Sequence, residues 1–228
     1  MGSGTIPAHK PTDAKSFLVW KTSEPFWILV VNDRLLTCRG FKLEGYVIPS
    51  FEVRSGEAVS LLLPSWLKHE RELRDCLTGA LSRSEIESAA RCVSVVPASP
   101  QTGIRGWFFN TMPLTWLMDR GLTRSEAATI LNRHDINERI PIGQLASSPR
   151  TLIGLEAAYH LRPDVVVFAM SGLDPLGRHA VVDLVRTHLG RTGFVCLTYP
   201  TTTNGISKYL PFPESNTFEV SSRSHVAV

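Results

Sequence analysis

The sequence has little of what marks disulfide-bonded, metal-ligated or membrane-spanning proteins. It has four cysteines in 228 residues, widely spaced and without a Cys-x-x-Cys pair, so the common zinc and dithiol motifs are excluded. The longest apolar run has six residues, 26–31, against the roughly 20 that cross a bilayer. The N-terminus lacks the basic and apolar segments of a secretory signal. We therefore expect a cytosolic protein with reduced cysteines and no transmembrane helix.

The chain also has no large excess of positive or negative charge. The net charge is +3, and no block of five or six basic residues occurs, so we expect no nucleic-acid partner. With 43% hydrophobic and 20% charged residues, the composition is that of an ordinary globular protein. A chain of this length suffices for one large domain with its own core.

Short β-rich runs open the chain at residues 26–31, 46–53 and 58–63, separated by turn residues. The first two runs predict an antiparallel layer. The third is apolar almost throughout, as a central parallel strand covered on both faces should be, and a helix-like segment at 68–81 follows it.

Strands and helices continue to alternate along the rest of the chain, which predicts an α/β fold with a parallel sheet. The motif Thr123-Arg-Ser-Glu126 is a capping box, so we expect a helix from there to about Arg133. The further elements expected are strands at 92–96, 164–168 and 194–197 and helices at 150–161 and 178–189.

Two stretches carry the most specific pattern, residues 145–164 and Ser171-Gly-Leu-Asp-Pro175. They resemble the signature loop with its helix and the D-loop of the nucleotide-binding domain of ABC transporters, and Leu176-Gly-Arg178 resembles the export-type branch. The resemblance implies a P-loop NTPase-like parallel sheet with an antiparallel N-terminal β layer and a small helical lobe. It implies a flexible N-terminus at 1–16, an ABC ATPase-like domain at 17–205 with the lobe at about 104–150, and a C-terminal tail at 206–228.

The phosphate-binding loop of that family is missing. Its place is taken by residues 64–73, Pro-Ser-Trp-Leu-Lys-His-Glu-Arg-Glu-Leu, which contain no glycine to let backbone amides face a phosphate. Trp66 and Leu67 add bulk there, and Glu70 and Glu72 add negative charge opposite an anionic ligand. We expect no bound ATP and no other cofactor.

The catalytic side chains that the resemblance would require are missing too. The acidic pair that holds magnesium and polarises water falls on Val167 and Phe168, or on Ala169 and Met170 with a two-residue deletion. The switch histidine falls at Tyr199 or its neighbour. The sequence therefore predicts no catalytic, cofactor-binding or metal-binding residues, and a pseudo-ATPase instead of an enzyme.

Contacts with partner subunits are the role that remains for the motifs whose spacing resembles that of the family. At the signature positions Ser147 and Ser148 retain hydroxyl groups that can donate hydrogen bonds, while Pro149 removes one amide. Asp174, in the D-loop-like motif, is able to contact a partner across a dimer interface, to cap the helix that starts at Pro175, or to do both.

Aromatic residues suggest a second interface. Trp107 and Phe108, with Trp116, form a permease-docking groove or ordinary core. Phe41 occupies the place of an adenine-stacking ring or is a buried aromatic.

The function predicted is a catalytically inactive ABC ATPase-like subunit, structural or regulatory, at the inner face of the cell membrane. Its expected partners are an active ABC ATPase or a second copy of itself, and a transmembrane permease. One alternative is an atypical nucleotide-binding switch or weak ATPase that uses Lys68 or Arg71. The other is a stand-alone protein-interaction module.

Overall fold

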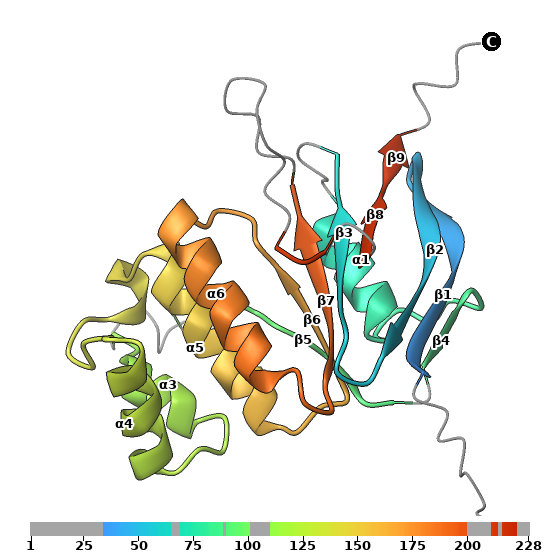
Figure 1. The fold of residues 1–228 in the computed structure, drawn as a ribbon. Coiled ribbons are helices and arrows are strands. Elements are labelled where there is room, and N and C mark those ends of the chain that lie inside the picture. The colour runs from blue at the N-terminus through green and yellow to red at the C-terminus, as the bar shows by residue number, and fades with distance from the viewer. Residues whose placement is uncertain are drawn as a thin grey trace, which may run out of the picture. The chain divides into compact units, whose positions relative to one another are not determined.

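The computed structural model describes residues 34–64, 69–88, 90–100, 110–199, 211–213 and 216–222. All of them belong to one of the chain's two compact units, Asp33–Val228 (Figure 1). The strand expected at 26–31 and the aromatic residues Trp107 and Phe108 lie outside the described residues.

An antiparallel sheet opens the unit, in the strand order β4-β1-β2-β9. Its bounds are β1 (Arg34–Leu43), β2 (Tyr46–Arg54), β4 (Ile86–Ser88) and β9 (Ser221–Ser222). Strand β2 confirms the run expected at 46–53. The longest strand, β1, was not predicted, although its buried and exposed side chains alternate over much of its length as in a half-buried strand.

A five-stranded parallel sheet forms the centre, in the order β5-β6-β7-β3-β8. Its bounds are β3 (Ala58–Leu62), β5 (Cys92–Ser94), β6 (Val165–Ala169), β7 (Gly193–Thr198) and β8 (Thr217–Glu219). All residues of β3 and β7 are buried, which explains their largely apolar sequences, interrupted by Ser60 and Thr198. Strand β8 joins the sheet from within the segment expected as a C-terminal tail.

Side chains of the central sheet alternate between two cores because successive residues of a strand face opposite sides. Val165 and Val167 of β6 pack with α1 (Glu70–Leu77) and the antiparallel sheet. Val166 and Phe168 pack with α5 (Ser147–His160) and α6 (Pro175–His188). Figure 1 shows α5 and α6 on one face of the sheet and α1 on the other. The fold is therefore the layered α/β arrangement that the sequence predicts.

A helical lobe lies beside α5 and has a core of its own. It contains α3 (Pro113–Met118), α4 (Arg124–Arg133) and the 3-10 turn η1 (Ile142–Gln144). The capping box is confirmed, because Thr123 Oγ1 accepts from the Glu126 amide and Glu126 Oε2 accepts from the Thr123 amide. In the described ranges, no helix combines the length and apolarity that a bilayer crossing requires.

Candidate functional site

A small cavity of about 90 Å³ lies between the first turn of α1 and the end of β6. Glu70 and Arg74 line it from α1, and Ala169 and Ser171 line it from the carboxyl end of β6. Crevices at the carboxyl ends of parallel strands are the usual ligand sites of open α/β sheets. We call this space the α1 cavity, and it is the place where the resemblance puts nucleotide chemistry.

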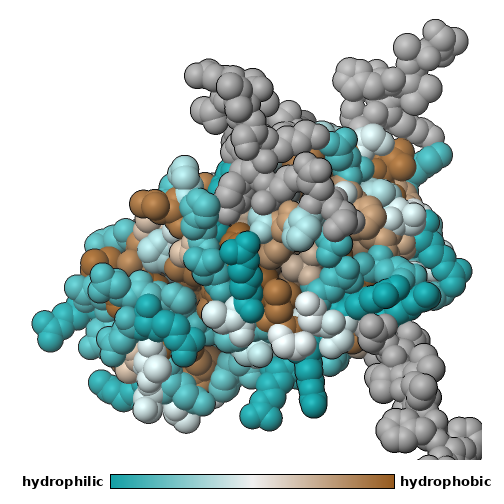
Figure 2. All heavy atoms as spheres, viewed as in Figure 1, coloured by the Kyte–Doolittle hydropathy of each residue, from teal (hydrophilic) through white to brown (hydrophobic). Residues whose placement is uncertain are grey.

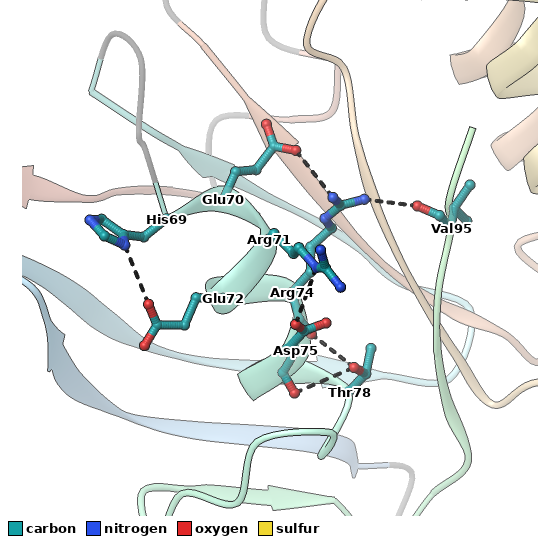
Figure 3. Close-up of polar contacts among 8 residues, drawn as sticks. All are labelled: His69, Glu70, Arg71, Glu72, Arg74, Asp75, Thr78 and Val95. Atoms are coloured by element: carbon teal, nitrogen blue, oxygen red, sulfur yellow. Dashed lines mark hydrogen bonds and ion pairs between the residues drawn. The ribbon is translucent and has the colours of Figure 1, made fainter. Parts of the chain in front are cut away.

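A network of hydrogen bonds and one ion pair lies at the N-terminal end of α1. The Tyr199 hydroxyl, just after β7, donates to Glu70 Oε2 over 2.8 Å. Arg74 Nη2 lies 3.7 Å from Glu70 Oε1, and Arg74 Nη1 donates to the Val95 carbonyl over 3.0 Å (Figure 3). The Glu70 and Arg74 side chains are only 18% and 16% exposed. The network thereby joins three segments that follow different strands: the start of α1, Val95 after β5 and Tyr199 after β7.

The network also fixes the protonation of Tyr199. Burial raises the pKa of its hydroxyl well above the ordinary value, and the hydrogen bond to the Glu70 carboxylate and its charge raise it further. The Tyr199 hydroxyl therefore stays protonated at neutral pH and acts as a hydrogen-bond donor to Glu70. A histidine here would have two ring nitrogens for proton transfer, whereas this phenol has a single donor that Glu70 engages.

Among the described residues that line the α1 cavity, Glu70 is the only one with a carboxylate, and it comes from the helix and not from β6. Val167 and Phe168 are fully buried in the two cores, and Ala169 and Ser171 reach the cavity without an acidic group. The partial positive charge of a helix N-terminus attracts anions, and here Glu70 in the first turn already supplies one. A phosphate would have to displace that carboxylate or bear its repulsion.

Lys68 and Arg71, the phosphate contacts of the alternative switch, and the neighbouring His69 are differently placed. Lys68 lies outside the described residues. His69 is engaged by two carboxylates, Glu44 and Glu72. The Arg71 side chain is 89% exposed and faces Asp75 at 3.9 Å.

Two residues expected at a dimer interface bond to each other within the chain. Ser148 Oγ donates to Asp174 Oδ2 over 2.8 Å, and Asp174 Oδ1 accepts from the Gly177 amide over 2.8 Å. Asp174 is thus the N-cap of α6, as the sequence allowed. The Gly177 amide above all, and then Ser148, lower the pKa of the Asp174 carboxyl. Ser147 is exposed beside Gly172, so the structure does bring Ser147, Ser148 and Asp174 together.

The residues that resemble a signature loop begin helix α5. Ser147, Ser148 and Pro149 occupy its first turn, with Ala146 as the N-cap. Proline is accepted there because the first amides of a helix have no intrahelical partner. Ser148 is 7% exposed, so its hydroxyl is committed within the chain.

Of the aromatic residues considered from the sequence, the structure describes Trp116 and Phe41, and both are buried. Trp116 is 3% exposed and belongs to the lobe core, and Arg120 stacks with its guanidinium carbon 3.2 Å from the ring centroid. Phe41 is also buried, with Arg83 above its ring. Both agree with the core alternative.

A groove of about 290 Å³ next to Trp116 was not predicted. Val96, 60% exposed, and Leu161, 40% exposed, line it between β5, α3 and α5. Single exposed apolar residues carry no sequence signal, and only the fold brings these two together.

Comparison with known proteins gives the fold a counterpart. No protein-family model and no curated protein matches the sequence. Among solved structures, this chain is similar to an inward-facing metal-chelate type ABC transporter, with a TM-score of 0.59, 14% identity and 86% of each chain covered. It is similar to an ATP-binding subunit of an ABC transporter, with a TM-score of 0.52, 16% identity, and 72% of this chain and 79% of that one covered.

A third similar structure is a bacterial Atm1-family ABC exporter with ATP bound, with a TM-score of 0.55 and 16% identity. The match covers 74% of this chain and 35% of the exporter chain. At such identities the likeness concerns the fold. The chain therefore has the fold of the ATP-binding subunits of ABC transporters, as its alternating strands and helices and its motif spacing predicted.

Proposed function

We propose that this chain is a catalytically inactive ABC ATPase-like subunit, a structural or regulatory partner in an ABC-type membrane transporter complex. The observation that carries the proposal is the position of Glu70. A carboxylate that is held by Tyr199 and Arg74 lies at the helix entrance beside the α1 cavity, and the end of β6 brings no acidic group to that cavity. Such a site repels phosphate. It also lacks the carboxylates that would hold magnesium and polarise the attacking water.

The groove beside Trp116 supports a membrane partner. It is open, apolar and lined by Val96 and Leu161, which suits a short amphipathic helix inserting its apolar face. The proteins with this fold named above are transporters or transporter subunits. We propose that a cytoplasmic segment of a permease binds here, which would hold the chain at the inner face of the membrane.

The surface around the start of α6 supports a second ATPase-like partner, an active ABC ATPase or another copy of this chain. Apolar side chains reach the surface at several points over the helices (Figure 2). Among large apolar residues in the described ranges Leu176 is the most exposed, at 81%, and it lies two residues after Asp174.

Nucleotide titration tests the inactive site. Isothermal titration with magnesium ATP should show no binding tighter than about 100 μM, equivalent to roughly 5.5 kcal/mol. Asp174→Ala serves to separate family-type chemistry from contamination. Tighter binding, together with turnover that Asp174→Ala abolishes, would overturn the proposal. Protection of Lys68 from acylation by nucleotide would favour the atypical switch instead.

Crosslinking tests the membrane partner. A photoreactive residue at position 96 should crosslink to a loop of a multi-spanning membrane protein, identified by mass spectrometry from native membranes. Leu161→Asp should abolish the crosslink, whereas Leu81→Asp, 44% exposed after α1 and not among the residues that line the groove, should leave it intact. Crosslinks to soluble proteins alone would favour the stand-alone interaction module.

A further inference from the structure

A histidine and two carboxylates converge between the antiparallel sheet and α1. His69 Nε2 lies 2.7 Å from Glu44 Oε2, and His69 Nδ1 lies 3.3 Å from Glu72 Oε2, the second contact being drawn in Figure 3. One ligand atom from each of the three residues falls within 4.8 Å of the others. Neither the phosphate-loop comparison nor the proposed function uses this cluster.

Each ring nitrogen of His69 faces a carboxylate oxygen. An imidazole nitrogen and carboxylate oxygens are both common ligands of protein metal ions. The geometry therefore brings one nitrogen ligand and two oxygen ligands close to one another.

We propose that Glu44, His69 and Glu72 bind a divalent transition-metal ion of the Zn²⁺ class. The ion takes one ring nitrogen and one oxygen of each carboxylate, and water completes its shell. Imidazole with carboxylates suits Zn²⁺, whereas Mg²⁺ and Ca²⁺ prefer oxygen alone. The positive end of α1 disfavours a cation, but the charges of Glu72 and of nearby Glu70 in the same turn oppose that effect.

The backbone explains how Glu44 reaches the helix. Glu44 and Gly45 form the two-residue turn between β1 and β2, with φ of 40° and 88°. Positive φ at both positions is the geometry of a type I′ turn, which favours asparagine and glycine. Glutamate is therefore less favourable at position 44 than asparagine or glycine would be. An ion bound to Glu44 and His69 would link this turn to the start of α1, because His69 directly precedes Glu70.

The side chains are open to solvent, so an ion has access. Glu44 is 59% exposed, Glu72 32% and His69 26%. The partial exposure also means that individual substitutions here should leave the fold intact.

Titration of tag-free, chelator-treated protein with ZnCl₂ tests the site. Isothermal calorimetry should show one saturable ion per chain, with MgCl₂ binding far more weakly. His69→Ala should abolish binding, and Glu72→Gln should weaken it by about 10–100-fold. Glu44→Asn should also weaken it while suiting the turn, so loss in that variant is not a folding defect. Zn²⁺ should raise the melting temperature of the wild type but not of His69→Ala.

His179→Ala and Glu138→Gln are the matched controls, because both residues are exposed and lie far along the chain from the cluster. They should bind as the wild type does. The proposal is overturned by an absence of saturable Zn²⁺ binding, by unchanged affinity in His69→Ala, or by Mg²⁺ binding as tightly as Zn²⁺. Each result is independent of ATP binding, so the site can fail while the proposed function stands.

Discussion

The Tyr199 hydroxyl donates to the Glu70 carboxylate over 2.8 Å, although the two residues are 129 positions apart. This bond joins the end of β7 to the first turn of α1. Together with the ion pair to Arg74, it holds the Glu70 carboxylate in place at the start of α1. An anionic ligand would have to displace this carboxylate from both partners or bear its repulsion.

Tyr199→Phe should lower the free energy of unfolding by about 1–2 kcal/mol, because it leaves a partly buried carboxylate without one donor. Urea denaturation measures the loss. In a double-mutant cycle with Glu70→Ala, which removes the acceptor, the two substitutions should be less than additive, since both remove the same bond. Additive effects would mean that the bond contributes nothing in solution.

Gly177→Ala tests the contact between α5 and α6. An added Cβ would lie 1.8 Å from Ser148 Oγ and 2.4 Å from Ser148 Cβ, so the two helices would have to separate. We expect a loss of about 3 kcal/mol in stability, near the upper end for overpacking. Gly190→Ala, with nothing within 4 Å of the added carbon, should unfold close to the wild type. Adding Ser148→Gly to Gly177→Ala should recover part of the loss.

Elements with a strong local pattern were predictable from sequence. Strand β3 is apolar except for Ser60 because both its faces are covered. The cap of α4 needs only Thr123 and Glu126, which are three residues apart. Asp174 before proline marks the start of α6 in the same local way. The family-like spacing between such elements then gave the fold.

Features that depend on pairing across the chain were not predictable. The three residues of β8 carry no period of their own and are strand only because β3 offers an edge. Glu70 was recognised as a charge opposed to phosphate, but its bond to Tyr199 needed the fold. The same holds for Ser148, whose hydroxyl was expected to donate a hydrogen bond and whose acceptor, Asp174, only the fold identifies.

Thr123→Ala should destabilise the chain by about 1 kcal/mol, because it leaves an amide in the first turn of α4 without its acceptor and releases Glu126. Thr129 provides the matched control. It lies on the same helix and donates only to the Ser125 carbonyl, so Thr129→Ala should have a smaller effect. Thermal unfolding of both variants gives the comparison. Equal losses would show that the cap has no special weight.

A buried carboxylate joins the helical lobe to the layered core. Glu156 of α5, 5% exposed, lies 2.8 Å from both Arg133 Nη1 and His134 Nε2 at the end of α4. Its other oxygen faces His188 Nε2 of α6 at 3.7 Å. Burial raises the pKa of Glu156, but the contacts with His134 and His188 and the charge of Arg133 outweigh it and lower the pKa from 4.5 to about 2.

The pH dependence of stability tests this arrangement. Because the pKa of Glu156 is lower in the folded chain, its contribution is complete above about pH 4.5 and disappears as the pH falls towards 2. The shift corresponds to about 3 kcal/mol. Glu156→Gln should cost about that much at pH 7, measured by urea denaturation, and the difference from wild type should shrink between pH 4.5 and 2.5. Glu138→Gln, on the exposed surface, should follow the wild type throughout. A difference that stays constant as the carboxyl protonates would show that Glu156 acts through packing and not through its charge.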